Sequence, residues 1–138
     1  MTPTLDIIRS DIEDLHVFLA GWLSGRLPKS RDAYESAVEA RLDSGFFNIQ
    51  PAGRVWRRAD LIPELWDAHG ISPTFDIRIS DVELHHVLEN GLGLATYLEH
   101  QSGAQNSAAD NTRRSSLLFR ADDPAIQWLS LHESRIDN

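Results

Sequence analysis

Four consecutive segments in the second half of the chain alternate between apolar and polar residues, and this pattern constrains the fold more than any other feature. The segments are TFDIRISDVELHHVLEN (74–90), GLGLATYLEHQ (91–101), TRRSSLLFRA (112–121) and AIQWLSLHESRI (125–136). A period of two is typical of strands, and turn residues or a polar loop at 102–111 separate the segments. The pattern predicts an antiparallel meander of four strands.

The first half of the chain is mainly helical in pattern. Apolar residues spaced by three and four predict an amphipathic helix over 4–24. Ser30 offers an N-cap for a second helix over 31–43, and RADLIPELWDAHG (58–70) predicts a third. Between them, a short strand at 46–49 ends at the turn formed by residues 51–53.

Helices followed by one curved sheet predict an α+β domain spanning residues 1–138, because neither half can bury its apolar surface alone. The expected architecture is a cone-shaped barrel, with N-terminal helices packed on a mostly antiparallel sheet. Such a sheet encloses a hollow, and a ligand would bind there.

Charge and composition exclude several functions. With 13 Lys plus Arg against 21 Asp plus Glu, the net charge of −8 disfavours nucleic acid and anionic membrane surfaces as partners. The N-terminal segment lacks the basic and apolar regions of a signal peptide, so we expect a cytoplasmic protein. There is no cysteine, which excludes thiolate chemistry and Cys-ligated metals. His85 and His86 would leave opposite faces of a strand, and the other histidines lack the spacing of metal ligands, so we expect no metal site. We also expect no cofactor.

Two stretches resemble a known family. The resemblance is carried by FFNIQPAGRVWRRADLIPEL and by RRSSLLFR followed by WLSLHES. It is a resemblance to the nuclear transport factor 2-like superfamily and, within its SnoaL-like branch, to the domain of unknown function 4440 group. The resemblance implies a conical α+β fold with a pocket in the cone, usually in a homodimer formed through the outer sheet face. Relatives include ketosteroid isomerase, scytalone dehydratase, polyketide cyclases and non-catalytic association domains, so the fold alone does not decide the function.

The chain departs from the pattern of this group in its polar residues. Asn48 stands where the group commonly has Glu, Ala52 stands where it has Ser, and His132-Glu133 stands where it often has His-Gln. If Asn48 and Glu133 face each other, this chain keeps a contact between one carboxylate and one amide. Relative to the group, the two strands have exchanged which of them carries the carboxylate and which carries the amide. This hypothesis requires the two side chains to lie within about 6 Å of each other.

The polar ends of the last two strands supply the candidate site. Strict alternation places Trp128 with His132 on one face and Glu133 on the other, and leaves open which face is inside. Arg113 and Ser115 are expected to line the mouth of the cone. Either Arg113 or Arg114 could hold a substrate carboxylate, because a guanidinium group presents two parallel donors. The alternative is a buried pair between one of these arginines and Glu133 or Glu99 that only closes the barrel end.

Aromatic and border residues complete the set of candidates. Trp56, Tyr97 and Trp128 could wall the pocket, although aromatic residues more often fill a core. Asp11 and His16 lie at opposite borders of the apolar stripe of the first helix. Asp11 could serve as a base with a raised pKa, but a solvated flank residue is the more common outcome.

These observations lead to one preferred function and two alternatives. The protein is expected to bind a modest apolar carbonyl or carboxylate compound, and any chemistry would be that of a cofactor-independent isomerase or lyase. In that reaction His132 or Glu133 would be the base, and Asn48 or Tyr97 would stabilise the developing oxyanion. The alternatives are a non-catalytic homodimeric association module, which would use the outer sheet face, and a dimer with a vestigial cavity.

Overall fold

The computed structural model describes residues 3–103, 110–122 and 125–136. The predicted loop at 102–111 and the predicted turn at 122–124 therefore lie partly outside the described residues. The described residues form four helical segments and six strands, which in order are α1 (Leu5–Ser24), α2 (Arg31–Tyr34), η1 (Glu35–Glu39), β1 (Leu42–Ile49), β2 (Val55–Arg57), α3 (Arg58–Asp67), β3 (Asp76–Val87), β4 (Leu92–Ser102), β5 (Asn111–Asp122) and β6 (Ala125–Ile136).

The helices begin where the local sequence predicts, and α1 also ends there. Thr4 caps α1 by accepting a hydrogen bond from the Ile7 amide, and Gly25 ends it in the left-handed region, with φ of 80°. Ser30 caps α2, which passes directly into the π-helical turn η1. The second helix ends at Glu39, earlier than predicted, because Leu42 is buried as the first residue of strand β1. Among the described residues, no helix combines the length and apolar character needed to cross a membrane.

All strands belong to one sheet with the order β2-β1-β6-β5-β4-β3. The predicted meander is confirmed, because β3, β4, β5 and β6 pair in sequence and each pair is antiparallel. Strand β1 pairs with β6 in parallel, and the short strand β2 forms the far edge beyond β1. The parallel pair and β2 were not predicted, because alternation within a segment carries no information about its distant partner.

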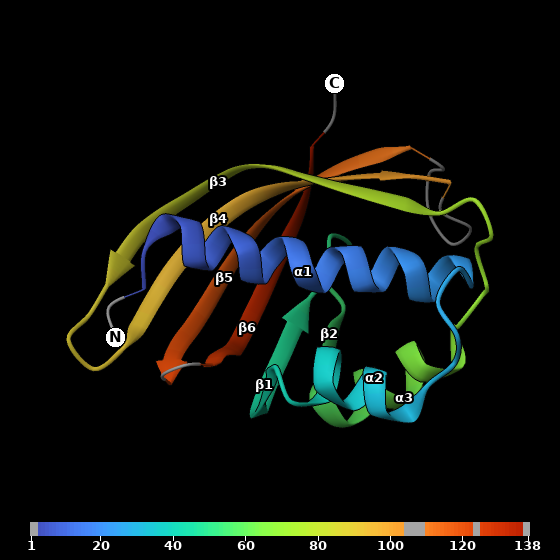
Figure 1. Ribbon diagram of the computed structural model, residues 1–138. Helices are drawn as coiled ribbons and strands as arrows, with labels where there is room; N and C mark the ends of the chain where they lie inside the picture. The colour runs from blue at the N-terminus through green and yellow to red at the C-terminus, as the bar shows by residue number, and fades with distance from the viewer. Residues whose placement is uncertain (1–2, 104–109, 123–124, 137–138) are drawn as a thin grey trace.

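The sheet bends strongly around α1, as Figure 1 shows. Irregularities in register mark the bends: β3 slips against β4 between Ser80 and Glu83, and Asp81 within this bulge has a φ of 53°. Helix α1 lies across the concave face of the sheet, and α2 and α3 lie near β1 and β2. This arrangement confirms the α+β cone fold, with a mixed sheet that does not close into a barrel.

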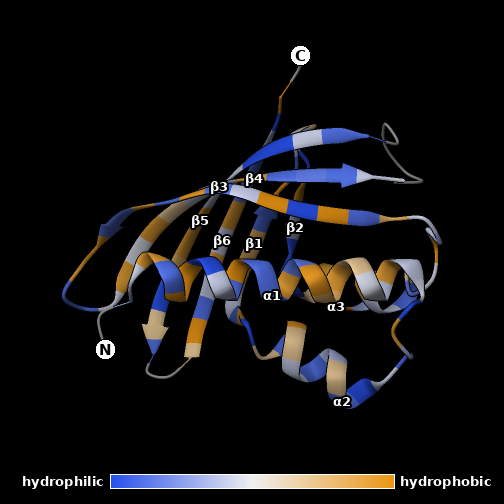
Figure 2. Ribbon diagram, turned by 45° about the horizontal axis from the view of Figure 1, so that its top comes forward, coloured by the Kyte–Doolittle hydropathy of each residue, from blue (hydrophilic) through white to orange (hydrophobic). Residues whose placement is uncertain are grey.

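The main core lies between α1 and the inner face of the sheet. Hydrophobic and hydrophilic residues alternate along the strands, so each strand presents one apolar face to the helix (Figure 2). The largest fully buried side chains of this core are Ile8, Ile12, Trp22, Tyr34, Tyr97, Leu117, Phe119 and Trp128. Trp22 packs against Tyr34 and Trp66, which agrees with the core-filling role expected for Trp22 and Trp66.

Candidate functional site

The helices and the concave sheet enclose a cavity of about 600 Å³, which we call the cone cavity. Its apolar wall comes from α1, α3 and β6 and includes Leu15, Leu19, Leu23, Leu61, Leu65 and Leu131. Its polar lining comes from α1 and from β1, β4, β5 and β6, and includes His16, Asn48, Glu99, Gln101, Arg113 and Glu133. A mainly apolar hollow with a few convergent polar groups is typical of small-molecule sites.

The strand register brings distant polar residues together on the inner face. Asn48 on β1 lies opposite Trp56 on β2, and on the other side β1 pairs with β6. Glu133 on β6 lies opposite Ser115 on β5, and Ser115 lies opposite Tyr97 on β4. Because directly paired residues share a face, Glu133, Ser115 and Tyr97 form one row across three strands. The pair of Asn48 and Trp56 lies beside this row, since Asn48 pairs with Leu131, two residues before Glu133.

A β-bulge explains how Trp128 and Glu133 come to lie on the same side of the sheet. Leu118 pairs with Ser130 but Phe119 pairs with Trp128, so Leu129 is an extra residue in β6. Strict alternation, which placed Trp128 and Glu133 on opposite faces, is therefore wrong across this bulge. Both residues are buried and line the cone cavity.

His132 and Arg114 lie on the other face of the sheet. Both are exposed, and neither lines the cone cavity. The reason is the two-residue period of strands, which turns the neighbours of an inward residue outward. The structure therefore separates His132 from Glu133 and Arg114 from Arg113, and it corrects their predicted placement in the pocket.

The Glu133 carboxylate is held from two sides. Asn48 Nδ2 donates to Glu133 Oε1 at 3.0 Å, and Arg113 Nη1 donates to Glu133 Oε2 at 3.1 Å. The hypothesis that Asn48 and Glu133 face each other is confirmed. The Arg113–Glu133 ion pair corresponds to the predicted alternative in which an arginine satisfies an acid at the end of the cone.

Burial dominates the acidity of Glu133. Removal from water, and then the negative charge of Glu99, raise the pKa of Glu133 above its ordinary value, against the opposing effects of Arg113 and Asn48. A carboxyl group with a raised pKa is a stronger base once ionised than an ordinary surface carboxylate. Such a group can accept a proton from a weakly acidic carbon and return it.

A second buried pair lies beside Glu133 and was not predicted. His16 Nε2 contacts Glu99 Oε1 at 3.1 Å, and the other ring nitrogen of His16 contacts the Ile12 carbonyl oxygen at 2.7 Å. Burial alone would lower the pKa of His16, but the charge and the hydrogen bond of Glu99 outweigh it and raise that pKa. Burial likewise opposes ionisation of Glu99, yet His16 brings the pKa of Glu99 below its ordinary value. Both shifts favour the ionised form of the pair.

The sequence contained a weak signal for this pair. His16 stood at the border of the apolar stripe, and Glu99 appeared only as a possible partner of an arginine. An acid at an inward position of a predicted strand needs a buried partner. The nearest helical residue able to provide one could be identified only from the packing of α1 on β4.

Tyr97 and Ser115 are fully buried but do not line the cone cavity. Their hydroxyl groups are shielded from solvent and interact with each other, and neither has a further hydrogen-bond partner among the described residues. Burial raises the pKa of the Tyr97 hydroxyl well above its usual value, so this group stays protonated. The structure thus places both predicted pocket residues directly behind the cavity wall, in the same row as Glu133.

Trp56 does line the cavity, and its indole nitrogen is distinctive. The guanidinium carbon of Arg54 stacks at 3.9 Å from the centre of the Trp56 ring. The indole Nε1 atom is shielded from solvent and has no partner within the described part of the chain. Trp128 differs, because its Nε1 donates to Asp11 Oδ2 at 2.7 Å. Trp56 therefore has an unpartnered donor beside the cavity, although this N–H does not face the open space in the described conformation.

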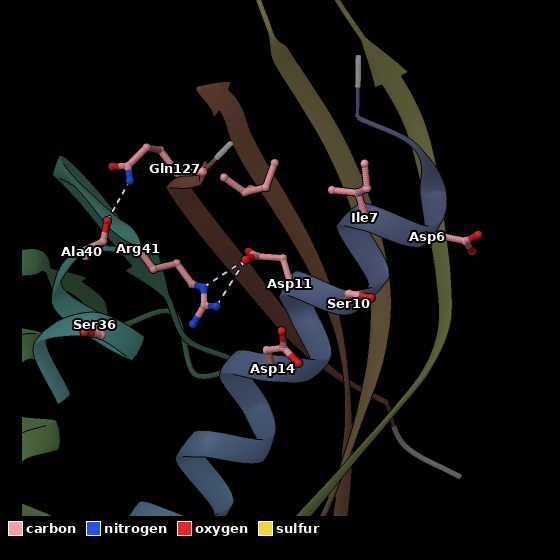
Figure 3. Close-up of a pocket in the computed structure, with 11 residues that line it drawn as sticks. Asp6, Ile7, Ser10, Asp11, Asp14, Ser36, Ala40, Arg41 and Gln127 are labelled. Carbon is pink, nitrogen blue, oxygen red and sulfur yellow. Dashed lines mark hydrogen bonds and ion pairs between the residues drawn. The ribbon is translucent and has the colours of Figure 1, made fainter. Parts of the chain in front are cut away.

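Asp11 belongs to a different hollow. A groove of about 490 Å³ lies between α1, η1 and the start of β6, and Figure 3 shows Asp11 turned toward Arg41 there. Asp11 Oδ1 accepts from Arg41 and Oδ2 accepts from Trp128, so both oxygens are engaged. Asp11 thus connects α1 to Arg41, just before β1, and to Trp128 on β6. These contacts favour a structural role for Asp11 over that of a base.

Among the residues that the structure covers, no group of three or more His, Asp or Glu is placed to hold a metal ion.

Comparison with known proteins supports the fold most strongly. A nuclear transport factor 2-like protein of unknown function from Pseudomonas aeruginosa is 27% identical, with a TM-score of 0.82 over 94% of this chain and 98% of that chain. A nuclear transport factor 2-like protein from Cytophaga hutchinsonii is 14% identical, with a TM-score of 0.73 over 97% and 99%. The beta subunit of the benzoate 1,2-dioxygenase from Burkholderia mallei is 10% identical, with a TM-score of 0.75 over 99% and 93%.

The other comparisons limit how finely the chain can be placed. No family model and no curated protein matches it. Membership of the domain of unknown function 4440 group therefore stays a prediction. The similarity to the Pseudomonas aeruginosa protein extends over nearly the full length of both chains. With its three-helix cover and curved six-stranded sheet, the chain belongs to the nuclear transport factor 2-like superfamily.

Proposed function

We propose that the protein binds an apolar carbonyl compound in the cone cavity and removes a proton from the carbon next to the carbonyl. Glu133 is the base in this proposal. The observation that carries it is the Glu133 carboxyl group, which is buried, has a raised pKa and lines a largely apolar cavity of about 600 Å³. No cofactor is required, because the reaction moves only a proton.

The oxyanion that develops on the substrate needs a hydrogen-bond donor. Asn48 uses its amide group on Glu133 and on the Leu131 carbonyl oxygen, and the Tyr97 hydroxyl lies behind the wall. The indole N–H of Trp56 is without a partner among the described residues and is therefore the better candidate, provided that the ring turns to expose this N–H to the ligand. Trp56 lies two strands from Glu133, or about 10 Å between strand axes. A bound carbonyl oxygen could reach Trp56 while its neighbouring carbon faces Glu133.

The cavity also distinguishes this proposal from an association module. In a module without a ligand, large aromatic side chains would fill the cone. Here the aromatic residues Trp22, Tyr34 and Trp66 pack together in a separate cluster, and the hollow beside Glu133 remains open. This arrangement supports a ligand site.

Binding can be tested with 2-tetralone, a bicyclic ketone with acidic protons beside its carbonyl, by following the indole N–H signals in nitrogen-15 NMR spectra. We expect the Trp56 signal to shift in a saturable way, because Trp56 lines the cavity. The Trp66 signal serves as the internal control, since Trp66 packs against Tyr34 away from the cavity lining. Assignment uses the single variants Trp56→Phe and Trp66→Phe. Equal shifts at both indoles, or none at either, would contradict a ligand site in the cone.

We also propose that a second copy of the chain packs on the outer sheet face. Phe47 and Leu118 both lie opposite Ser130 in the register of their strand pairs, and Leu94 lies opposite Leu118. Phe47 and Leu118 are exposed. Three apolar side chains thus form a row across this face, which a partner would cover.

The variant Leu118→Glu tests the proposed dimer, because it places a charge within the apolar row. We expect the wild-type protein to sediment as a dimer and Leu118→Glu to sediment as a monomer in analytical ultracentrifugation. The matched control is Val17→Glu, on the exposed side of α1. A wild-type monomer, or a dimer that survives Leu118→Glu, would exclude this face as the interface.

A further inference from the structure

Two arginines at the cone cavity have no acidic partner in the described structure. Arg135 and Arg54 both line the cavity, and neither forms an ion pair among the described residues. Arg113, by contrast, donates to Glu133 and to Asn111. Both residues are exposed, so solvent rather than a protein partner screens their charges, and both remain available to an anion that enters the cavity.

Arg135 is exposed to solvent and lies beside a second positive charge. Arg135 lies directly opposite Arg113 in the antiparallel pair of β5 and β6, and both line the same cavity. Like charges directly opposite each other destabilise a sheet. Glu133 offsets the charge of Arg113, but nothing among the described residues offsets that of Arg135. An anion bound at this point would relieve the repulsion.

Arg54 extends the same positive region toward the edge of the sheet. Its backbone carbonyl accepts from the Gln50 amide in the turn between β1 and β2, and its guanidinium group covers the ring of Trp56. Glu64 on α3 also lines the cavity without a partner among the described residues, but it is one carboxylate against two guanidinium groups. The unpaired charge of the lining is therefore positive.

We propose that the substrate of this site is an apolar carbonyl compound that also carries a carboxylate, and that Arg135 binds this carboxylate with help from Arg54. The proposal rests on the proposed function and names its substrate class. A guanidinium group can donate two parallel hydrogen bonds to one carboxylate. Arg135 comes two residues after Glu133, about 7 Å farther along the strand. The acid group therefore lies several bonds from the carbon that loses its proton.

Two matched probes test this proposal: 2-naphthoate, which carries the charge, and 2-naphthamide, its neutral counterpart of almost the same shape. We expect the wild-type protein to bind the carboxylate roughly 10- to 100-fold more tightly than the amide in calorimetric titrations, as charge-assisted hydrogen bonds allow. Arg135→Gln should remove this preference while leaving the affinity for the amide unchanged. The control is Arg114→Gln, on the neighbouring strand but the opposite face, which should keep the preference.

Each other outcome overturns the proposal in a distinct way. If the amide binds but the carboxylate binds no more tightly, the cavity takes ligands and the anion site is wrong. The same holds if Arg135→Gln retains the full preference. If neither probe binds to the wild-type protein, both the anion site and the proposed cavity function fail.

Discussion

Replacing His16 with Phe is expected to lower the free energy of unfolding by about 3–5 kcal/mol, because Glu99 would remain buried without its charge partner. The side chains of His16 and Glu99 are only 5% and 6% exposed, so water would replace the imidazolium group poorly. Phe has a similar ring, which keeps the loss of packing small. Urea unfolding at pH 5.5, followed by tryptophan fluorescence and circular dichroism, measures the change.

A double variant separates the charge effect from packing. In His16→Phe with Glu99→Met, neither buried charge remains, and Met fills nearly the volume of Glu. We expect this variant to recover most of the stability that the single variant loses, since an apolar pair often replaces a buried ion pair at little cost. If the double variant is as unstable as His16→Phe, the loss arises from packing and the pair is not responsible.

The ionic pair also predicts how stability depends on pH. The pKa of His16 is raised, so its contribution is complete below 6.5, its ordinary value, and is lost as the pH rises through the raised pKa. The pKa of Glu99 is lowered, so its contribution is complete above 4.5 and is lost as the pH falls through the lowered pKa. The stability advantage of the wild-type protein over the double variant should therefore peak between these values and decline on both sides.

Local patterns predicted most of the fold. The spacing of apolar residues predicted α1, and alternation predicted the four strands of the meander, because each signal lies within one segment. The parallel pairing of β1 with β6 depends on contacts between residues more than 80 positions apart, such as Asn48 and Leu131. No local period reports such a contact, which explains why this pairing and the edge strand β2 were not predicted.

The site was predicted only in part, and one residue explains the main error. Leu129 is the extra residue of a β-bulge, and it shifts Trp128 relative to Glu133 by one position. Alternation counted through the bulge could not decide whether Glu133 or His132 faces inward. The Asn48–Glu133 contact was predicted because it rested on a comparison of residue types at two strands. The His16–Glu99 pair was not, because it depends on how α1 is seated on the sheet.

Removing the base itself should have the largest effect on chemistry. In the variant Glu133→Gln, the amide retains the shape of the carboxyl group but cannot accept a proton at neutral pH. We expect the rate at which the protein exchanges the acidic protons of 2-tetralone with deuterium to fall by roughly 10²- to 10⁴-fold, the usual contribution of a general base. Proton NMR in heavy water follows the exchange. The binding shift at Trp56 should remain, which shows that the variant is folded and occupied.

The pH profile and a control variant tie this loss to Glu133. Since the base acts in its ionised form, the wild-type rate should rise with pH through the pKa of Glu133, and that rise should lie above 4.5, the ordinary value for Glu. Glu83→Gln removes an exposed carboxylate of β3 and should leave the rate unchanged. A full rate in Glu133→Gln would refute the assignment. A comparable loss in His132→Gln would instead place the base on the outer face of the sheet. The rate would then not depend on a buried carboxylate, and its rise with pH would not be explained by the raised pKa of Glu133.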